Sequence, residues 1–136
     1  MELPFNIRIA GFDYEIVPTE KKLVAKKKDV GYEGTGNIEL RGQCDYVSQK
    51  IDISTCFPED AIKQTLLHEL VHAISNHYKV PLPEDTETME EVVDSISCGL
   101  FQVFKDNPEL LKLFVDQPEG LNSNEFNQEE SKEDIT

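Results

Sequence analysis

The sequence predicts an α+β fold in which a small N-terminal antiparallel sheet packs on a C-terminal helical part. Two observations indicate this division: short β-prone runs crowd residues 5–53, whereas long runs with helical periodicity follow residue 58. The length of 136 residues is sufficient for one domain with its own hydrophobic core. We therefore expect a single domain over residues 1–117.

The strands are predicted from β-branched or alternating runs that turn residues separate. Residues 5–10 and 14–17 flank Gly11, Phe12 and Asp13, which favours a hairpin. The lysines between residues 21 and 28 indicate an exposed loop or hairpin tip. The remaining strand candidates are residues 37–40, 44–47 and 50–53.

Helices are predicted for the part of the chain that follows. Pro58, Glu59 and Asp60 favour the start of a helix that continues to about residue 78. Its apolar side chains gather on one arc, and a different arc carries two histidines. A second helix is expected over residues 86–104, and a third, short one through about residue 115.

Composition and charge exclude several classes of protein. The formal net charge of -14 argues against nucleic-acid binding, because phosphate contacts require Lys and Arg. No apolar run approaches the ~18 residues of a membrane helix, and we see no signal-peptide pattern. The three cysteines form no Cys-x-x-Cys pair, which favours reduced thiols and a cytoplasmic protein. Residues 118–136 are acidic and nearly devoid of apolar side chains, so we expect a disordered tail.

The first predicted helix contains the pattern His-Glu-x-x-His. His68 and His72 lie four residues apart, so both side chains project from one face and can approach one metal ion. Zinc binds such ring nitrogens at about 2.0–2.1 Å, and catalytic zinc sites usually have three protein ligands. Glu69 lies about 100° around the helix from His68, where its carboxylate can reach a water beside the metal.

A third ligand is expected from the second helix, which offers Glu90 and Glu91. Glu90 lies on the same stripe as Val93 and Ser97, which is the face that packs inward. We therefore predict Glu90 as the ligand and keep Glu91 as the alternative. Asp94 follows Glu90 by one turn and is suited to hold the other ring nitrogen of a ligating histidine.

Together these motifs resemble a known family. Residues 51–54, the helix start at Pro58, the His-Glu-Leu-Val-His core and the pair Glu90 and Asp94 are similar to small zincin-like metallopeptidases of bacteria and phages. The similarity is broadly to the ImmA/IrrE-type group within the gluzincins and covers about residues 37–104. Val71 departs from the group, where Gly is common, and no helix-turn-helix segment is visible. The resemblance implies an edge strand, at residues 37–40 or 44–47, that receives an extended peptide.

The resemblance also implies zinc ligands at His68, His72 and Glu90 and a general base at Glu69. The predicted function is that of a zinc-dependent endopeptidase of phage or prophage type, which hydrolyses a protein or peptide substrate by metal-activated water. One alternative is a catalytically silent zinc-binding module that binds a protein partner. Another is a protein without metal in which the motif is a coincidence.

Tyr46, His77 and Tyr78 are all candidates to stabilise the oxyanion, and we assign none of them. The physiological substrate and the oligomeric state are not predicted from these residues.

Overall fold

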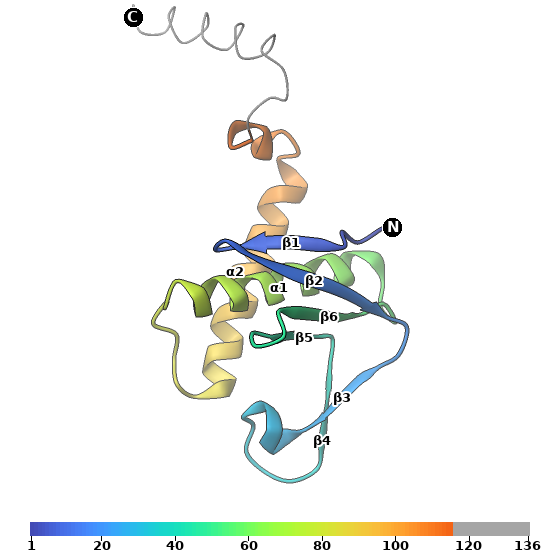
Figure 1. Cartoon of the computed structure of the whole chain (residues 1–136), viewed down its shortest axis with the longest axis vertical. Helices are drawn as coiled ribbons and strands as arrows, with labels where there is room; N and C mark the ends of the chain where they lie inside the picture. The colour runs from blue at the N-terminus through green and yellow to red at the C-terminus, as the bar shows by residue number, and fades with distance from the viewer. Residues whose placement is uncertain (116–136) are drawn as a thin grey trace, which may run out of the picture. The chain divides into compact units, whose positions relative to one another are not determined.

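The computed structural model describes residues 1–115, and its first unit, Met1–Val103, contains a four-stranded sheet in the order β1-β2-β6-β5 (Figure 1). The strands are β1 (Asn6–Ile9), β2 (Phe12–Thr19), β5 (Gly42–Asp45) and β6 (Lys50–Ser54). The α+β class is confirmed. The prediction of a wholly antiparallel sheet is wrong, because β2 and β6 pair in parallel.

The parallel pairing follows from the path of the chain between β2 and β6. Parallel neighbours need a connection of a dozen or more residues. Here that connection contains β3 (Leu23–Lys26), a short 3-10 helix η1 (Lys27–Val30), β4 (Asn37–Leu40) and β5. β3 and β4 pair with each other as a separate antiparallel hairpin. We call residues 23–40 the arm; Figure 1 shows it as a two-stranded extension beside the main sheet.

Two local details differ from the sequence prediction. The hairpin between β1 and β2 turns at Ala10 and Gly11, both of which have positive φ angles (51° and 85°), as a type I′ turn requires. β2 therefore begins at Phe12 instead of after Asp13. In the lysine-rich segment, residues 23–26 form a strand, whereas Lys27 and Lys28 lie in η1 near the tip of the hairpin.

Two helices follow the sheet. α1 (Glu59–His77) matches the first predicted helix, with Pro58 as its N-terminal cap residue. α2 (Thr86–Asp106) matches the second. In the second unit, which begins at Phe104, the third predicted helix is only the 3-10 turn η2 (Leu110–Leu113). Within residues 1–115, none of the helices combines the length and the hydrophobicity that a membrane-spanning helix requires.

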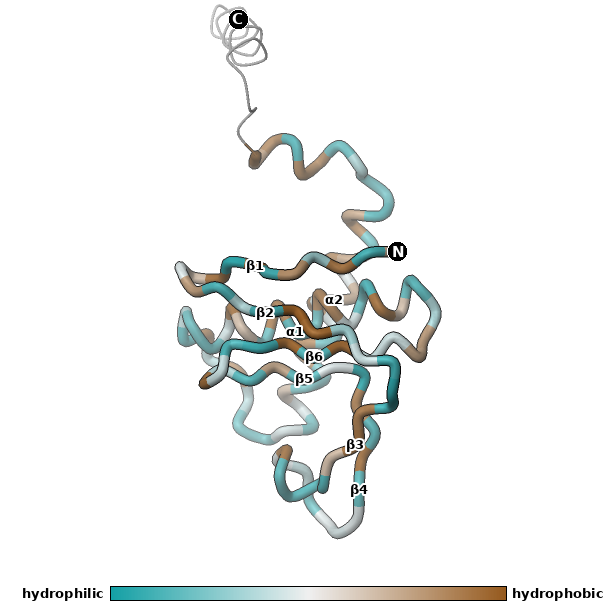
Figure 2. Tube along the Cα trace, turned by 45° about the vertical axis from the view of Figure 1, so that its right-hand side comes forward, coloured by the Kyte–Doolittle hydropathy of each residue, from teal (hydrophilic) through white to brown (hydrophobic). Residues whose placement is uncertain are grey.

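The core lies between the sheet and α1. Tyr14, Ile16, Ile51 and Ile53 have 0–2% of their surface exposed and pack with Ile62 and Ala73 of α1. Figure 2 shows hydrophobic stretches along the two central strands, β2 and β6, with α1 behind them. α1 also buries polar side chains, which the prediction of one apolar arc did not foresee: Thr65, Glu69, His72 and Ser75.

The predicted boundary at residue 117 and the predicted tail over residues 118–136 lie outside the described residues. Both stay predictions. The three cysteines, all within the described part, are free thiols, as expected: Cys44, Cys56 and Cys98.

Candidate metal centre

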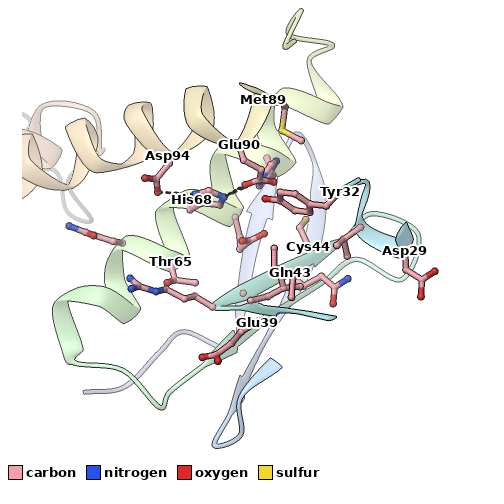
Figure 3. A pocket seen from close by; sticks show the side chains of 18 of the residues that line it. Asp29, Tyr32, Glu39, Gln43, Cys44, Thr65, His68, Met89, Glu90 and Asp94 are labelled. Carbon is pink, nitrogen blue, oxygen red and sulfur yellow. Dashed lines mark hydrogen bonds and ion pairs between the residues drawn. The ribbon is translucent and has the colours of Figure 1, made fainter. Parts of the chain in front are cut away.

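Two helices bring three potential metal ligands together. His68 and His72 project from α1 and Glu90 from α2, and their ligand atoms all lie within 4.8 Å of one another. His68 Nε2 lies 2.8 Å from one oxygen of Glu90, and His72 Nε2 lies 3.0 Å from the other. Figure 3 shows Glu90 reaching across from α2 to His68. Within residues 1–115, no other group of three or more His, Cys, Asp or Glu residues brings its ligand atoms this close together. The group could hold a metal ion.

The spacing of these atoms fits the dimensions of a small tetrahedral ion. The two Nε2 atoms are 3.2 Å apart, and the nitrogen–oxygen distances are 2.8 and 3.0 Å. Ligands at about 2.0–2.1 Å from a tetrahedral zinc lie about 3.3 Å from one another. The three side chains therefore need only a few tenths of an ångström of adjustment. Two nitrogens and one oxygen also form a ligand set that zinc accepts.

Asp94 supports this arrangement from the opposite side of the first histidine. Its Oδ1 lies 3.3 Å from His68 Nδ1, as the dashed line in Figure 3 shows. Because a carboxylate only accepts hydrogen bonds, His68 donates its Nδ1–H to Asp94, and its Nε2 faces Glu90 and His72. Glu91, the alternative ligand, is exposed and does not belong to the group.

Charges within the group alter the pKa values of its members. Burial alone would raise the pKa of Glu90, but hydrogen bonds from His68 and His72 outweigh it and lower this pKa to about 2. Burial alone would lower the pKa of His68, but the hydrogen bond to Glu90 and the charges of Glu69 and Glu90 raise it. Without metal, hydrogen bonds between the two histidines and Glu90 therefore hold the group together. A metal cation that bound there would displace the protons of these hydrogen bonds.

Glu69 is the most buried acid of the site, with 5% of its surface exposed. Burial raises its pKa to about 7; the two histidines oppose this rise and Glu90 adds to it. A carboxyl group with a pKa near neutrality can both accept and release a proton at physiological pH.

The three metal-ligand candidates and Glu69 line an open cleft of about 690 Å³. Its walls come from the arm, β5, α1 and α2, all within the first unit. This volume is in the range of sites that enclose a small ligand or a few residues of a peptide. Among the Asp, Glu, Lys and Arg residues of the lining, five are acidic and one is an arginine: Asp29, Glu39, Glu69, Glu90, Asp94 and Arg41.

The three residues considered for the oxyanion role lie in different places. Tyr46 lines the cleft, and its hydroxyl donates to the backbone carbonyl of His72 at 3.5 Å. His77 shares a 2.6 Å hydrogen bond with Tyr14 and stacks on Phe12, and it does not line the cleft. Tyr78 is 66% exposed and also lies outside the cleft lining.

Sequence reasoning missed two residues of the cleft. Tyr32 lies in the glycine-rich loop between η1 and β4, and Gly42 begins β5; both line the cleft. An aromatic residue between Gly31 and Gly34 was the available signal for Tyr32, because glycines permit the positive φ angles of a tight turn from which a side chain can project. No such signal marks Gly42 in the sequence.

No known protein family, curated protein or solved structure matches this chain. The family resemblance therefore depends on the motif and its spacing, and membership stays a prediction. What stands independently is the possible metal site formed by His68, His72 and Glu90.

Proposed function

We propose that this chain is a zinc-dependent peptidase that cleaves internal peptide bonds. The observation that carries the proposal is the meeting of His68 and His72 with Glu90, beside the buried acid Glu69, in an open cleft. Two histidines and a glutamate from neighbouring helices are a ligand set of catalytic zinc sites, which leave one position open.

Each protein group has a distinct role in this proposal. Zinc, when bound to the three ligands, lowers the pKa of water towards ~7 and polarises the substrate carbonyl. Glu69 accepts the proton of the attacking water and transfers it to the nitrogen of the leaving amine. Asp94 holds the ring of His68 in the orientation that leaves Nε2 for the metal.

The edge of the sheet offers a place for the substrate backbone. β5 is the last strand in the order β1-β2-β6-β5, so one of its sides has no strand partner in this sheet. Gly42, Gln43 and Cys44 of this strand line the cleft. An extended peptide that pairs with β5 would therefore pass close to the histidines and Glu69.

Metal analysis of the purified protein tests the site itself. We expect about one zinc per chain in the wild type and none in His68→Ala. Glu91→Gln is the matched control, because it removes a neighbouring charge on an exposed position outside the group. A wild-type chain that binds no zinc at neutral pH contradicts the proposal.

Cleavage of denatured casein then separates the enzyme from the silent binding module. Glu69→Gln should keep one zinc per chain and lose cleavage, because an amide cannot accept the proton. If the zinc-loaded wild type cleaves none of a panel of denatured proteins, the peptidase is excluded and the zinc-binding module remains.

A further inference from the structure

Tyr32 enters the cleft from the wall opposite α1. It belongs to the arm, whereas the metal-ligand candidates belong to the two helices. Figure 3 shows its ring directed across the cleft towards Glu90 and His68. The residue is partly buried, and the cleft is thus bounded by a phenol on one side and by the possible metal site on the other.

The backbone around Tyr32 is held by two contacts. The N–H of Tyr32 donates to the carbonyl of Lys27 at 2.9 Å, which closes η1. Gly31 has a φ of 87°, and a Cβ atom there would lie 2.6 Å from Oγ1 of Thr86. The loop therefore lies against the first residue of α2, one turn before Glu90. This contact places the loop that carries Tyr32 beside the first turn of α2.

The charge environment keeps the phenol protonated. Burial raises the pKa of Tyr32, and the carboxylates of Glu90 and Glu87 raise it further. At neutral pH the side chain is therefore an O–H donor, which is the form that can stabilise developing negative charge.

Two other side chains of the cleft lining that can donate, Tyr46 and Arg41, have contacts elsewhere. The hydroxyl of Tyr46 donates to the carbonyl of His72. The guanidinium of Arg41 lies over the ring of Phe57, 4.9 Å from its centroid. His77 and Tyr78 do not line the cleft. Tyr32, in contrast, directs its ring across the cleft towards Glu90 and His68 (Figure 3).

We propose that Tyr32 is a substrate-contacting residue whose hydroxyl donates a hydrogen bond to the scissile carbonyl oxygen as negative charge develops on it. The inference rests on the proposed peptidase function and names a further residue of the same site. No proton leaves the phenol during the step, so Tyr32 acts as a donor and Glu69 alone transfers protons. A donor that acts only as charge develops contributes to the rate more than to ground-state binding.

Binding of a transition-state analogue to the zinc-loaded chain tests this role without turnover. The probe is a phosphinic tetrapeptide, acetyl-Ala-Phe-ψ(PO2-CH2)-Ala-Ala-amide, whose tetrahedral anionic oxygens mimic the oxyanion. Isothermal titration calorimetry should show that Tyr32→Phe weakens binding roughly 100-fold, since one oxyanion donor contributes about 10²–10³. The ketomethylene analogue, which keeps a trigonal carbonyl, should lose much less. Tyr78→Phe, which alters an exposed tyrosine outside the cleft, should bind both like the wild type.

Three outcomes overturn the inference. The first is a Tyr32→Phe chain that binds the phosphinic peptide as tightly as the wild type. The second is a wild type that does not bind it. The third is a Tyr32→Phe chain that loses as much affinity for zinc as it loses for the phosphinic peptide. Tyr32 would then be a positioning residue for Glu90. Failure of the peptidase is recognised separately: the wild type then binds the analogue through Tyr32 but cleaves no casein.

Discussion

Gly42 of β5 and Glu69 of α1 approach each other so closely that a Cβ atom on Gly42 would lie 3.2 Å from Cγ of Glu69. The same Cβ atom would lie 2.7 Å from Cγ2 of Thr65 and 3.0 Å from the carbonyl oxygen of Asp52. Strand and helix are therefore in contact at the proposed general base. The absence of a side chain at position 42 allows Glu69 to occupy its buried position.

Gly42→Ala should consequently destabilise the protein. The added methyl group has contacts on both sides, and overpacking of this kind costs about 1–3 kcal/mol. Urea unfolding measures the loss. Gly99→Ala is the matched control: no atom lies within 4 Å of its Cβ position on α2, and replacing a helical Gly by Ala stabilises by about 0.5–1 kcal/mol. A midpoint of Gly42→Ala that is no lower than that of the wild type would show that the strand adjusts without cost.

The raised pKa of Glu69 predicts how the stability of the metal-free chain depends on pH. Its pKa rises from the ordinary 4.5 to about 7 on folding, so between these values the folded state binds a proton that the unfolded state does not. The contribution of Glu69 to stability is therefore complete below pH 4.5 and is lost as the pH rises towards 7. The loss is roughly 3 kcal/mol at 1.36 kcal/mol per pKa unit.

Glu69→Gln should remove this loss, because the amide stays neutral at every pH. Urea unfolding of chelator-treated protein at pH 5 and pH 8 measures the effect. We expect the variant to be more stable than the wild type at pH 8, and the difference to shrink at pH 5. A wild type whose stability increases from pH 5 to pH 8 relative to the variant contradicts the assignment.

The thiols should differ in reactivity although all three are reduced. Burial, followed by the charges of Glu69 and Asp45, raises the pKa of Cys44 to about 12. Because the thiolate is the nucleophile, iodoacetamide at pH 8 should modify the exposed Cys56 well before Cys44. Mass spectrometry of digested protein at successive times gives both rates, and the rates should converge in 8 M urea. Equal rates in the folded protein would show that Cys44 is not protected.

The features that the sequence predicted are local ones. The positions of His68, Glu69 and His72 follow from helical periodicity over five residues, and Glu90 follows from the stripe that it shares with Val93. These residues lie together in the structure because one connection between two helices separates them in the chain. The α+β class followed from the same kind of local pattern.

The features that the sequence did not predict depend on contacts between distant residues. The parallel pairing of β2 with β6 depends on how the arm connects them, which no local period encodes. Residues 23–26 form a strand because they pair with residues 37–40, which lie more than ten positions later in the chain. Tyr32 enters the cleft because Gly31 lies against Thr86, a contact between residues 55 positions apart in the chain (86 − 31). Such placements come from tertiary packing.

Zinc affinity should distinguish the two adjacent glutamates of α2. Glu90→Gln removes the carboxylate that lies 2.8 and 3.0 Å from the two histidine nitrogens. We expect its zinc affinity to fall by more than about 100-fold, because loss of a ligand exceeds the 10–100-fold effect of an outer-shell group. Competition with a chelator of known affinity measures the change.

Asp94→Asn and Glu91→Gln complete this series, since each also removes one negative charge from α2. Asp94→Asn keeps an oxygen that accepts from His68 Nδ1 but loses its charge, so the affinity should fall about 10-fold. Glu91→Gln should leave the affinity unchanged, because Glu91 is exposed and lies outside the group. If all three variants weaken zinc binding equally, the negative charge of α2 attracts the ion in a general way and Glu90 is not its ligand. A graded loss that is largest for Glu90 and absent for Glu91 identifies Glu90 as the third ligand.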